Sequence, residues 1–185
     1  MQRQDSLLEA ERRLMYQETA RISLDVLQFG RDQPRELDPD HVEILTECFR
    51  NEDCQRLPVR NHVPALISQQ QLANAMRHSG VFTEQLLAGH LSGYSMLKVP
   101  TSCHLECLHG RHRIEAAREF LLPTDRWWTV DLYLPKLNTN LRSWLVEEYS
   151  NEQKPTDDEI YRKLRQYDAE RNLITSQREV LHESW

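Results

Sequence analysis

The stretch from Leu105 to Phe120 constrains the fold of this chain more than any other stretch. It begins as a short apolar-rich run, is interrupted by Gly110, and continues in helix-favouring residues that include the small Ala116 and Ala117. An apolar run followed by a glycine and a helix-forming segment is typical of a strand, a tight turn and a helix. We therefore expect a strand–turn–helix unit at the centre of the domain.

The first turn of this expected helix is basic, because Arg111, His112 and Arg113 follow Gly110 directly. A helix N-terminus has unsatisfied N–H groups and the positive end of the helix dipole, so it attracts anions. Arginine and histidine there favour phosphate, and Gly110 allows a close approach of the backbone. The alternative is a basic turn that meets only solvent or an acidic neighbour, with His112 as a hydrogen-bonded structural imidazole.

Composition is that of a soluble globular protein with one sizeable core, since 28% of the 185 residues are charged and 39% are hydrophobic. The net charge of -6 disfavours sequence-independent binding of nucleic acid through overall charge. No apolar run approaches the roughly 20 residues of a membrane span. The segment Met1–Asp5 lacks the apolar core of a signal peptide, so we expect an intracellular protein with no membrane partner.

A zinc site is one interpretation of Cys48, Cys54, Cys103 and Cys107, because histidines lie near the second pair. Neither cysteine pair has the two-residue gap of a zinc knuckle. In a reducing compartment, buried free thiols are the expectation.

The hydrophobic pattern alternates between strand-like and helix-like segments. Strands are expected at 22–27, 57–63, 105–109 and 128–134, with 65–67 as a continuation or partner of the second strand. Helices are expected at 6–19, 69–78, 84–87, 111–122, 140–149 and from Thr156, with a further helix that Asp38 caps and Pro39 begins. This order predicts an α+β (in part α/β-like) domain with a small mixed β-sheet flanked by helices.

Three segments carry a resemblance to the N-terminal domain of the ParB family. Gln33–Arg35, then a helix and Leu57–Val59, resembles the opening of that domain. Gly110–Ala117 resembles the family's Gly-Glu-Arg-Arg-x-Arg-Ala box, and Glu148–Glu159 is similar in spacing to its third box. The resemblance covers about Ile22 to Tyr167 and implies a ParB/sulfiredoxin-like fold with helical N- and C-terminal extensions. It places the extension at 1–21, the domain at 22–150 with an insertion at about 69–101, and a helical segment at 151–185.

The whole chain, with its Leu108–Arg113 box and Arg126–Trp128, also resembles a family of fungal proteins that carry this domain. In the ParB/sulfiredoxin superfamily the strand–turn–helix binds nucleotide phosphates, of CTP in ParB and ATP in sulfiredoxin. The resemblance therefore implies that Gly110, Arg111, His112 and Arg113 hold phosphates. Arg35 is expected to close over the nucleotide, or else to pair with Glu36 or Asp38.

Several positions depart from the family patterns. Arg111 replaces the Glu of the ParB box and also the catalytic cysteine of the sulfiredoxin box, so sulfinic acid reduction is rejected. Tyr149 and Glu152 replace the Asn and Arg of the third box, unless Asn151 supplies the amide through a shifted register. Glu147 or Glu148 is a candidate ligand for Mg²⁺, which prefers carboxylate and phosphate oxygens; the alternative is that both face solvent.

These observations favour a nucleotide-binding domain for CTP or ATP, acting as a switch or a weak triphosphatase, with homodimerisation left open. The alternative is a non-enzymatic module for DNA or protein that uses the same turn, with Trp127, Trp128 and Tyr133 as stacking surfaces. Acidic net charge disfavours that alternative, and aromatic residues at strand spacing are usually core. A nuclease is disfavoured, since no carboxylate cluster has the spacing of a metal pair.

Overall fold

The computed structural model describes residues 2–30, 37–87 and 93–148, with side chains described from Ser6 to Val146 within these ranges. The chain divides into two compact units, Met1–Tyr149 and Ser150–Trp185. The description below concerns the first unit, and the predicted C-terminal segment 151–185 lies outside the described residues. The domain boundaries expected from the sequence stay predictions.

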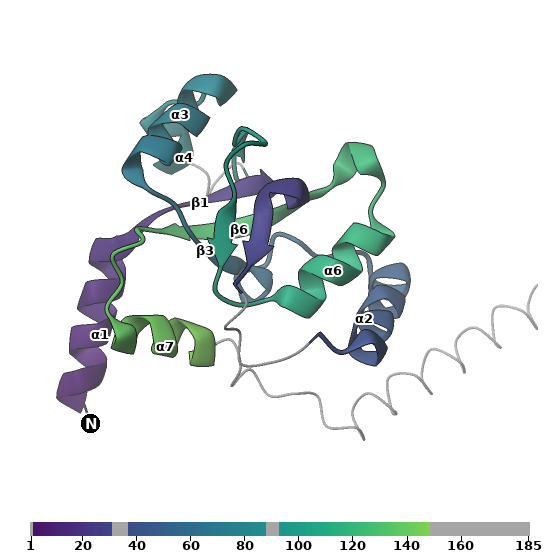
Figure 1. Ribbon diagram of the computed structural model, residues 1–185, viewed down its shortest axis with the longest axis horizontal. Coiled ribbons are helices and arrows are strands. Elements are labelled where there is room, and N and C mark those ends of the chain that lie inside the picture. The colour runs from purple at the N-terminus through teal and green to yellow at the C-terminus, as the bar shows by residue number, and fades with distance from the viewer. Residues whose placement is uncertain (1, 31–36, 88–92, 149–185) are drawn as a thin grey trace, which may run out of the picture. The chain divides into compact units, whose positions relative to one another are not determined.

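A mixed sheet forms the centre of this unit, with the strand order β2-β5-β3-β6-β1-β4 (Figure 1). Parallel pairs join β1 to β4, β2 to β5 and β3 to β6, whereas β1 with β6 and β3 with β5 are antiparallel. The strands are β1 Tyr16–Ser23, β2 Leu27–Phe29, β3 Val63–Leu66, β4 Met96–Leu97, β5 Leu105–Cys107 and β6 Trp127–Tyr133.

Helices flank the sheet, with α2 and α6 packed together at one side and α1 and α7 together at another (Figure 1). The prediction of an α+β fold with a small mixed sheet flanked by helices is therefore confirmed. The helices are α1 Gln2–Met15, α2 Pro39–Glu52, α3 Gln69–Ser79, α4 Thr83–Leu87, α6 Arg111–Phe120 and α7 Thr139–Glu148, with short 3₁₀ turns η1 Leu24–Val26, η2 Val59–Asn61 and η3 Pro123–Asp125.

Local capping explains where two of the helices begin. The Asp38 side chain accepts hydrogen bonds from the backbone N–H groups of Asp40 and His41, and Pro39 occupies the first position of α2, as predicted. Ser68 and Gln71 form a capping box at the start of α3. That helix ends at Gly80, which has the left-handed conformation typical of a glycine C-cap.

Four sequence-based boundaries were wrong: the start and the end of α1, the start of β1 and the start of β3. Ser6 is not an N-cap, because α1 already begins at Gln2, and this helix ends at Met15 rather than near Thr19. Strand β1 then occupies Tyr16–Ser23, where the prediction began a strand only at Ile22. Pairing of β1 along β6 stabilises this segment as a strand, and such long-range pairing overrides local helical propensity. The strand predicted at 57–63 starts only at Val63, after a 3₁₀ turn.

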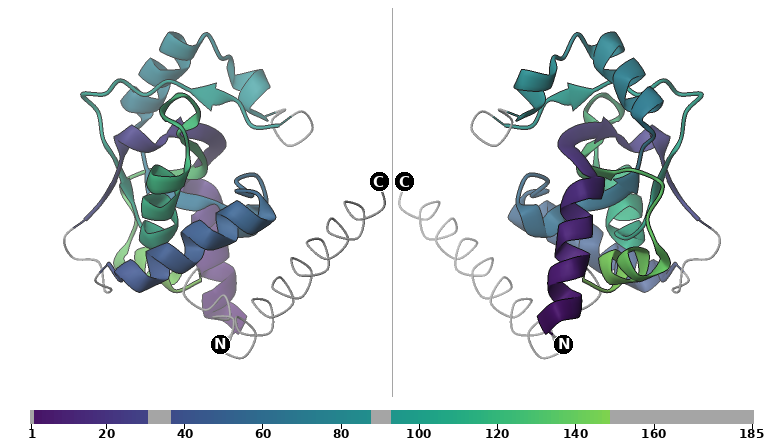
Figure 2. Two further views of the ribbon diagram at one scale, coloured as in Figure 1. Left: turned by 90° about the vertical axis from the view of Figure 1, so that its right-hand side faces the viewer. Right: turned by 90° about the vertical axis from the view of Figure 1, so that its left-hand side faces the viewer.

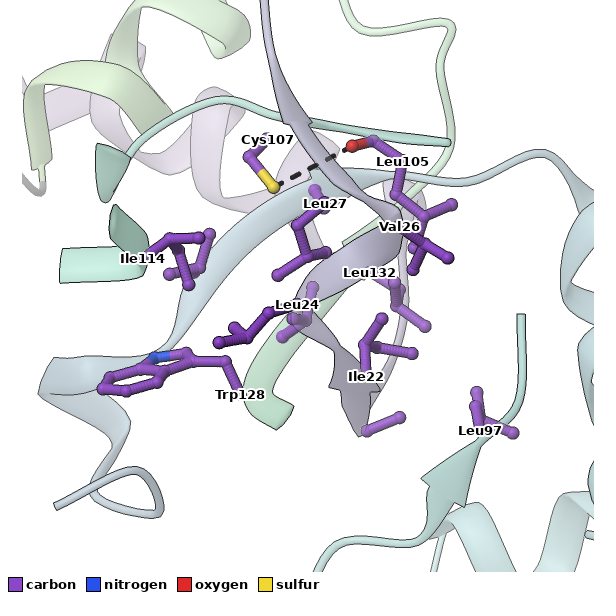
Figure 3. Close-up of a cluster of buried hydrophobic side chains, with 14 of the residues drawn as sticks. Ile22, Leu24, Val26, Leu27, Leu97, Leu105, Cys107, Ile114, Trp128 and Leu132 are labelled. Atoms are coloured by element: carbon purple, nitrogen blue, oxygen red, sulfur yellow. Dashed lines mark hydrogen bonds between the residues drawn. The ribbon is translucent and has the colours of Figure 1, made fainter. Parts of the chain in front are cut away.

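Each face of the sheet has its own hydrophobic cluster, because strand side chains alternate between faces. Trp128 and Leu132 of β6 join the larger cluster with Ile114 of α6 (Figure 3). Tyr133 belongs to the second cluster, which contains Leu145 of α7 and lies beside α1. Figure 2 shows α1 and α7 together in the right-hand view. Both faces of the sheet centre are therefore covered.

Strand β6 is confirmed, but it is buried more completely than an alternating pattern implies. Clean alternation is typical of a half-buried strand, yet every residue from Trp128 to Tyr133 is buried. The reason is its position between β3 and β1 at the centre of the sheet. Its polar residues Thr129 and Asp131 are therefore enclosed, and Asp131 requires hydrogen-bond partners.

Candidate functional site

The turn between β5 and α6 is the expected strand–turn–helix. Gly110 is the N-cap of α6, with φ 92° and ψ 18°, a left-handed conformation that glycine adopts without steric cost. Because glycine has no side chain, the N-cap supplies no side-chain hydrogen bond to the first turn of α6. The helix dipole and the N–H groups of that turn make an anion a favourable partner.

Close packing against β3 is a second reason for glycine at this turn. A Cβ atom at position 110 would lie 2.8 Å from Cγ2 of Val63, closer than real Cβ contacts come. The backbone of the turn therefore passes directly over the start of β3. This contact sets where the first turn of α6 begins.

Arg113 is anchored to the segment that precedes β3. Its Nη1 atom donates a 3.4 Å hydrogen bond to the carbonyl oxygen of Asn61. The same carbonyl accepts a 2.7 Å hydrogen bond from the indole Nε1 of the buried Trp128. Arg113 therefore has a structural contact that fixes its guanidinium group beside the first turn of α6.

His112 links α6 to α2. Its Nε2 atom accepts a 2.9 Å hydrogen bond from the backbone N–H of Asp38, the N-cap of α2. A backbone N–H can only donate, so this nitrogen is unprotonated, and the proton of a neutral imidazole lies on Nδ1. The ring of His41 lies alongside, with the two ring centroids 4.9 Å apart. His112 is thus a hydrogen-bonded structural imidazole that joins the start of α6 to the start of α2.

Arg111 completes the basic turn. Arg111 is partly exposed, and no hydrogen bond or ion pair joins its side chain to another residue in the described ranges. Gly110, Arg111, His112 and Arg113 therefore lie together at one helix end, because they are consecutive in the chain.

The other predicted site residues have no described side chains. Arg35 and Asn151 lie outside the described residues, and Glu147 and Glu148 end α7 with only their backbone described. No group of three or more His, Cys, Asp or Glu side chains gathers as a metal site within 2–30, 37–87 and 93–148. Magnesium binding by Glu147 or Glu148 stays a prediction.

A buried polar network on the other face of the sheet was missed by the sequence analysis. Thr19 of β1 donates a 2.5 Å hydrogen bond to Oδ1 of Asp131 on β6, and Nδ1 of His62 lies 3.0 Å from the same oxygen. All three residues are buried. They are far apart in the sequence, so no spacing reveals them; the available signal was an aspartate within the apolar strand 127–133.

The predicted aromatic stacking surface does not form. Trp128 and Tyr133 are 0% and 1% exposed, so neither ring can stack on a nucleic-acid base. Trp127 contacts protein cations instead, since Cζ of Arg56 lies 3.7 Å and Cζ of Arg21 lies 5.2 Å from a Trp127 ring centroid.

The cysteines differ in exposure. The expectation of buried thiols is right for Cys107, where burial raises the pKa to about 12, and wrong for Cys48, which is exposed on α2. Cys54 and Cys103 are partly exposed, and none of the four cysteines is in a disulfide bond.

The fold and this helix end define the class of protein to which the chain belongs. It is a mixed α+β domain with a basic, glycine-capped helix N-terminus beside its central sheet. Residues 15–151 match the family described as the N-terminal domain of a protein of unknown function, DUF3723, and the chain belongs to that family. No curated protein matches the sequence.

One solved structure with some similarity is the C-terminally truncated chromosome-partitioning protein ParB from Caulobacter crescentus, in complex with CTP-gamma-S. The match has 14% sequence identity and a TM-score of 0.42, and it covers 75% of this chain and 54% of the ParB chain. The fungal origin and the sulfiredoxin likeness expected from the sequence stay predictions. Within the part of the chain that the structure describes, no helix has both the length and the apolar content needed to span a bilayer.

Proposed function

We propose that the first turn of α6 binds the phosphate groups of a nucleoside triphosphate, CTP or ATP, and that the domain acts as a nucleotide-dependent switch or a weak triphosphatase. The observation that carries the proposal is the left-handed Gly110 N-cap, which has no capping side chain and is followed by Arg111, His112 and Arg113. N–H groups, helix dipole and guanidinium groups there all favour phosphate oxygens.

The contacts of each residue suggest its role in the proposed site. Arg111 has no described partner to give up when a phosphate binds. His112 lies at the same helix end and is held there by the hydrogen bond from Asp38 to its Nε2 atom. Arg113 keeps its anchor on Asn61 and brings a guanidinium charge to the same helix end. The sequence resemblance of Gly110–Ala117 to the ParB box supports the same ligand.

Further parts of the proposal rest on sequence alone. Arg35 would close over the nucleotide, and Asn151 would contribute its amide. Glu147 or Glu148 would hold Mg²⁺ against the phosphates, since magnesium prefers carboxylate and phosphate oxygens. These roles predict that removal of magnesium weakens nucleotide binding.

The second candidate function is a non-enzymatic DNA- or protein-binding module, in which the same turn holds a backbone phosphate. The burial of Trp128 and Tyr133 removes two of the three stacking surfaces expected for it. The net charge of -6 also opposes DNA binding. We therefore favour the nucleotide.

The test is calorimetric titration of the full chain with CTP, ATP and GTP in the presence of magnesium, for the wild type and for Arg111→Ala. We expect one nucleotide to bind in the micromolar range and the variant to bind it about 10-fold more weakly or worse, as expected for loss of a charged hydrogen bond. Arg77→Ala is the matched control, because Arg77 is exposed on α3, far along the chain from the turn.

Two results would contradict the proposal: no nucleotide binds, or Arg111→Ala and Arg77→Ala bind it equally well. Binding of DNA with a steep dependence on salt, without binding of nucleotide, would establish the second candidate instead.

A further inference from the structure

Arg21 on β1 is positioned by an aromatic ring rather than by a carboxylate. Its Cζ atom lies 5.2 Å from a ring centroid of Trp127 on β6. In the part of the chain that the structure describes, its buried Nε atom has no hydrogen-bond partner, and no ion pair joins its guanidinium group to an acidic residue. A cation beside an aromatic ring is attracted by the ring quadrupole and keeps its charge. The charge of Arg21 is therefore available to an anionic group of another molecule.

Trp127 is itself held by Arg56 and Asp125. Cζ of Arg56 lies 3.7 Å from a Trp127 ring centroid, over one face of the ring. Nη2 of Arg56 forms a 2.8 Å ion pair with Asp125, and the indole Nε1 of Trp127 donates a 2.7 Å hydrogen bond to the other oxygen of that carboxylate. The Arg56 side chain is only 15% exposed. Trp127 is thus a fixed support for two arginines.

Exposed apolar residues lie next to these arginines. Leu57 follows Arg56 directly and is 50% exposed, and Val59 is 68% exposed. Val59 also lines a small pocket together with Asp131. Because alternate residues of a strand share a face, Trp127 and Asp131 lie on the same face of β6. Val59 and Trp127 therefore border the same face of the sheet.

Positive charge is in excess on this surface, although the whole chain has a net charge of -6. Arg60 donates a 3.2 Å hydrogen bond to the side-chain oxygen of Gln55, a neutral group, so its charge is not offset. Asp125 offsets Arg56 alone. Three arginines outnumber the carboxylates even when the exposed Asp25, just beyond β1, is counted as well. The arginine–tryptophan surface consists of Arg21, Arg56, Leu57, Val59, Arg60 and Trp127.

We propose that the arginine–tryptophan surface binds an acidic peptide segment of a partner protein. Carboxylates of the segment contact the arginines, because a planar guanidinium matches a carboxylate with paired hydrogen bonds. An apolar side chain of the segment packs on Leu57 and Val59. Tryptophan and arginine dominate the binding energy of many protein–protein interfaces. The charges of the surface and of the segment are complementary, which favours and orients their association.

A peptide fits this surface better than a nucleic acid does. Arg56 covers one face of the Trp127 ring, so that face cannot stack on a base. A phosphate backbone also has no apolar side chain to bury against Leu57 and Val59. The acidic net charge of the chain opposes nucleic-acid binding as well.

Selection from a random dodecapeptide library on the full chain tests this inference. The counter-selection uses the double variant Arg21→Gln with Arg60→Gln, and thermal unfolding checks that it is folded. We expect the retained peptides to be rich in aspartate and glutamate and to share at least one apolar residue. Fluorescence anisotropy of the most enriched peptide should give a Kd on the order of 100 µM or lower, as for a small interface.

Single variants localise the binding of the enriched peptide. Arg21→Gln and Leu57→Ser should each weaken it about 5-fold or more. Arg77→Gln, at an exposed arginine on α3, is the matched control and should leave it unchanged. No enrichment, enrichment of peptides that are not acidic, or equal binding by the arginine variants would overturn the inference.

Two further results would also overturn it. Loss of peptide binding in Arg111→Gln would place the acidic segment at the turn of α6. Tighter binding of a labelled oligothymidine than of the peptide, lost in Arg21→Gln, would identify nucleic acid as the partner of this surface.

Discussion

The backbone N–H of Asp38 donates a 2.9 Å hydrogen bond to Nε2 of His112, and this bond joins the N-cap of α2 to the first turn of α6. The two residues are 74 positions apart in the chain. The basic turn at which we propose phosphate binding is thus held by a second helix as well as by the sheet.

Replacement of His112 tests this link. We expect His112→Ala to lower the free energy of unfolding by about 1 kcal/mol, because the Asp38 N–H loses its acceptor. Chemical denaturation measures the change. His104→Ala is the control, since His104 is exposed and has no hydrogen bond within the described residues. Equal stability of the two variants would show that the Asp38–His112 bond contributes nothing.

Gly110→Ala should be the more damaging of two glycine substitutions. Gly80 and Gly110 both have positive φ, so alanine at either costs about 1–2 kcal/mol. At position 110 the new Cβ also meets Cγ2 of Val63 at 2.8 Å, whereas at position 80 nothing lies within 4 Å. We expect Gly110→Ala to lower the free energy of unfolding by at least about 1 kcal/mol more than Gly80→Ala. Equal losses in thermal or chemical denaturation would mean that the turn can move away from β3.

Two buried threonines should respond oppositely to valine, which has nearly the same shape. Thr19→Val leaves the Tyr16 hydroxyl without its acceptor and removes one of the donors to Asp131, so we expect a loss of about 1–3 kcal/mol. The hydroxyl of Thr129 is buried and has no hydrogen-bond partner among the described residues. Thr129→Val should therefore be neutral or stabilising. Chemical denaturation of both variants checks this, and a larger loss for Thr129→Val would contradict the network.

Asp125 predicts a pH dependence. The hydrogen bond from Arg56, at 2.8 Å, lowers the pKa of Asp125 below its ordinary value of 3.8. A carboxyl group whose pKa is lower in the folded state adds stability above its ordinary pKa and loses it as the pH falls through the lowered pKa. Wild type should therefore be more stable than Asp125→Asn at neutral pH, and the difference should shrink below about pH 4. Denaturation across this range tests the sign; a difference that grows on acidification would refute it.

Helix ends and turns that depend on neighbouring residues were predictable from the sequence. The Asp38–Pro39 start of α2, the Gly80 end of α3 and the turn at Gly110 each depend on residues that lie within a few positions of one another. The alternation in β6 identified that strand for the same reason. The basic residues of the candidate phosphate site were visible because they are consecutive.

The conformation of β1 and the buried network around Asp131 depend on contacts between residues far apart in the chain. The residues of β1 were misassigned because their strand conformation depends on pairing with β6, more than 100 positions away in the chain. The burial of Asp131, and its contacts with Thr19 and His62, depend on β6 lying between β3 and β1. Capping and periodicity act over a few residues, so a sequence displays them. Burial, hydrogen-bond networks and pockets arise where distant strands and helices meet, so they are set when the chain folds.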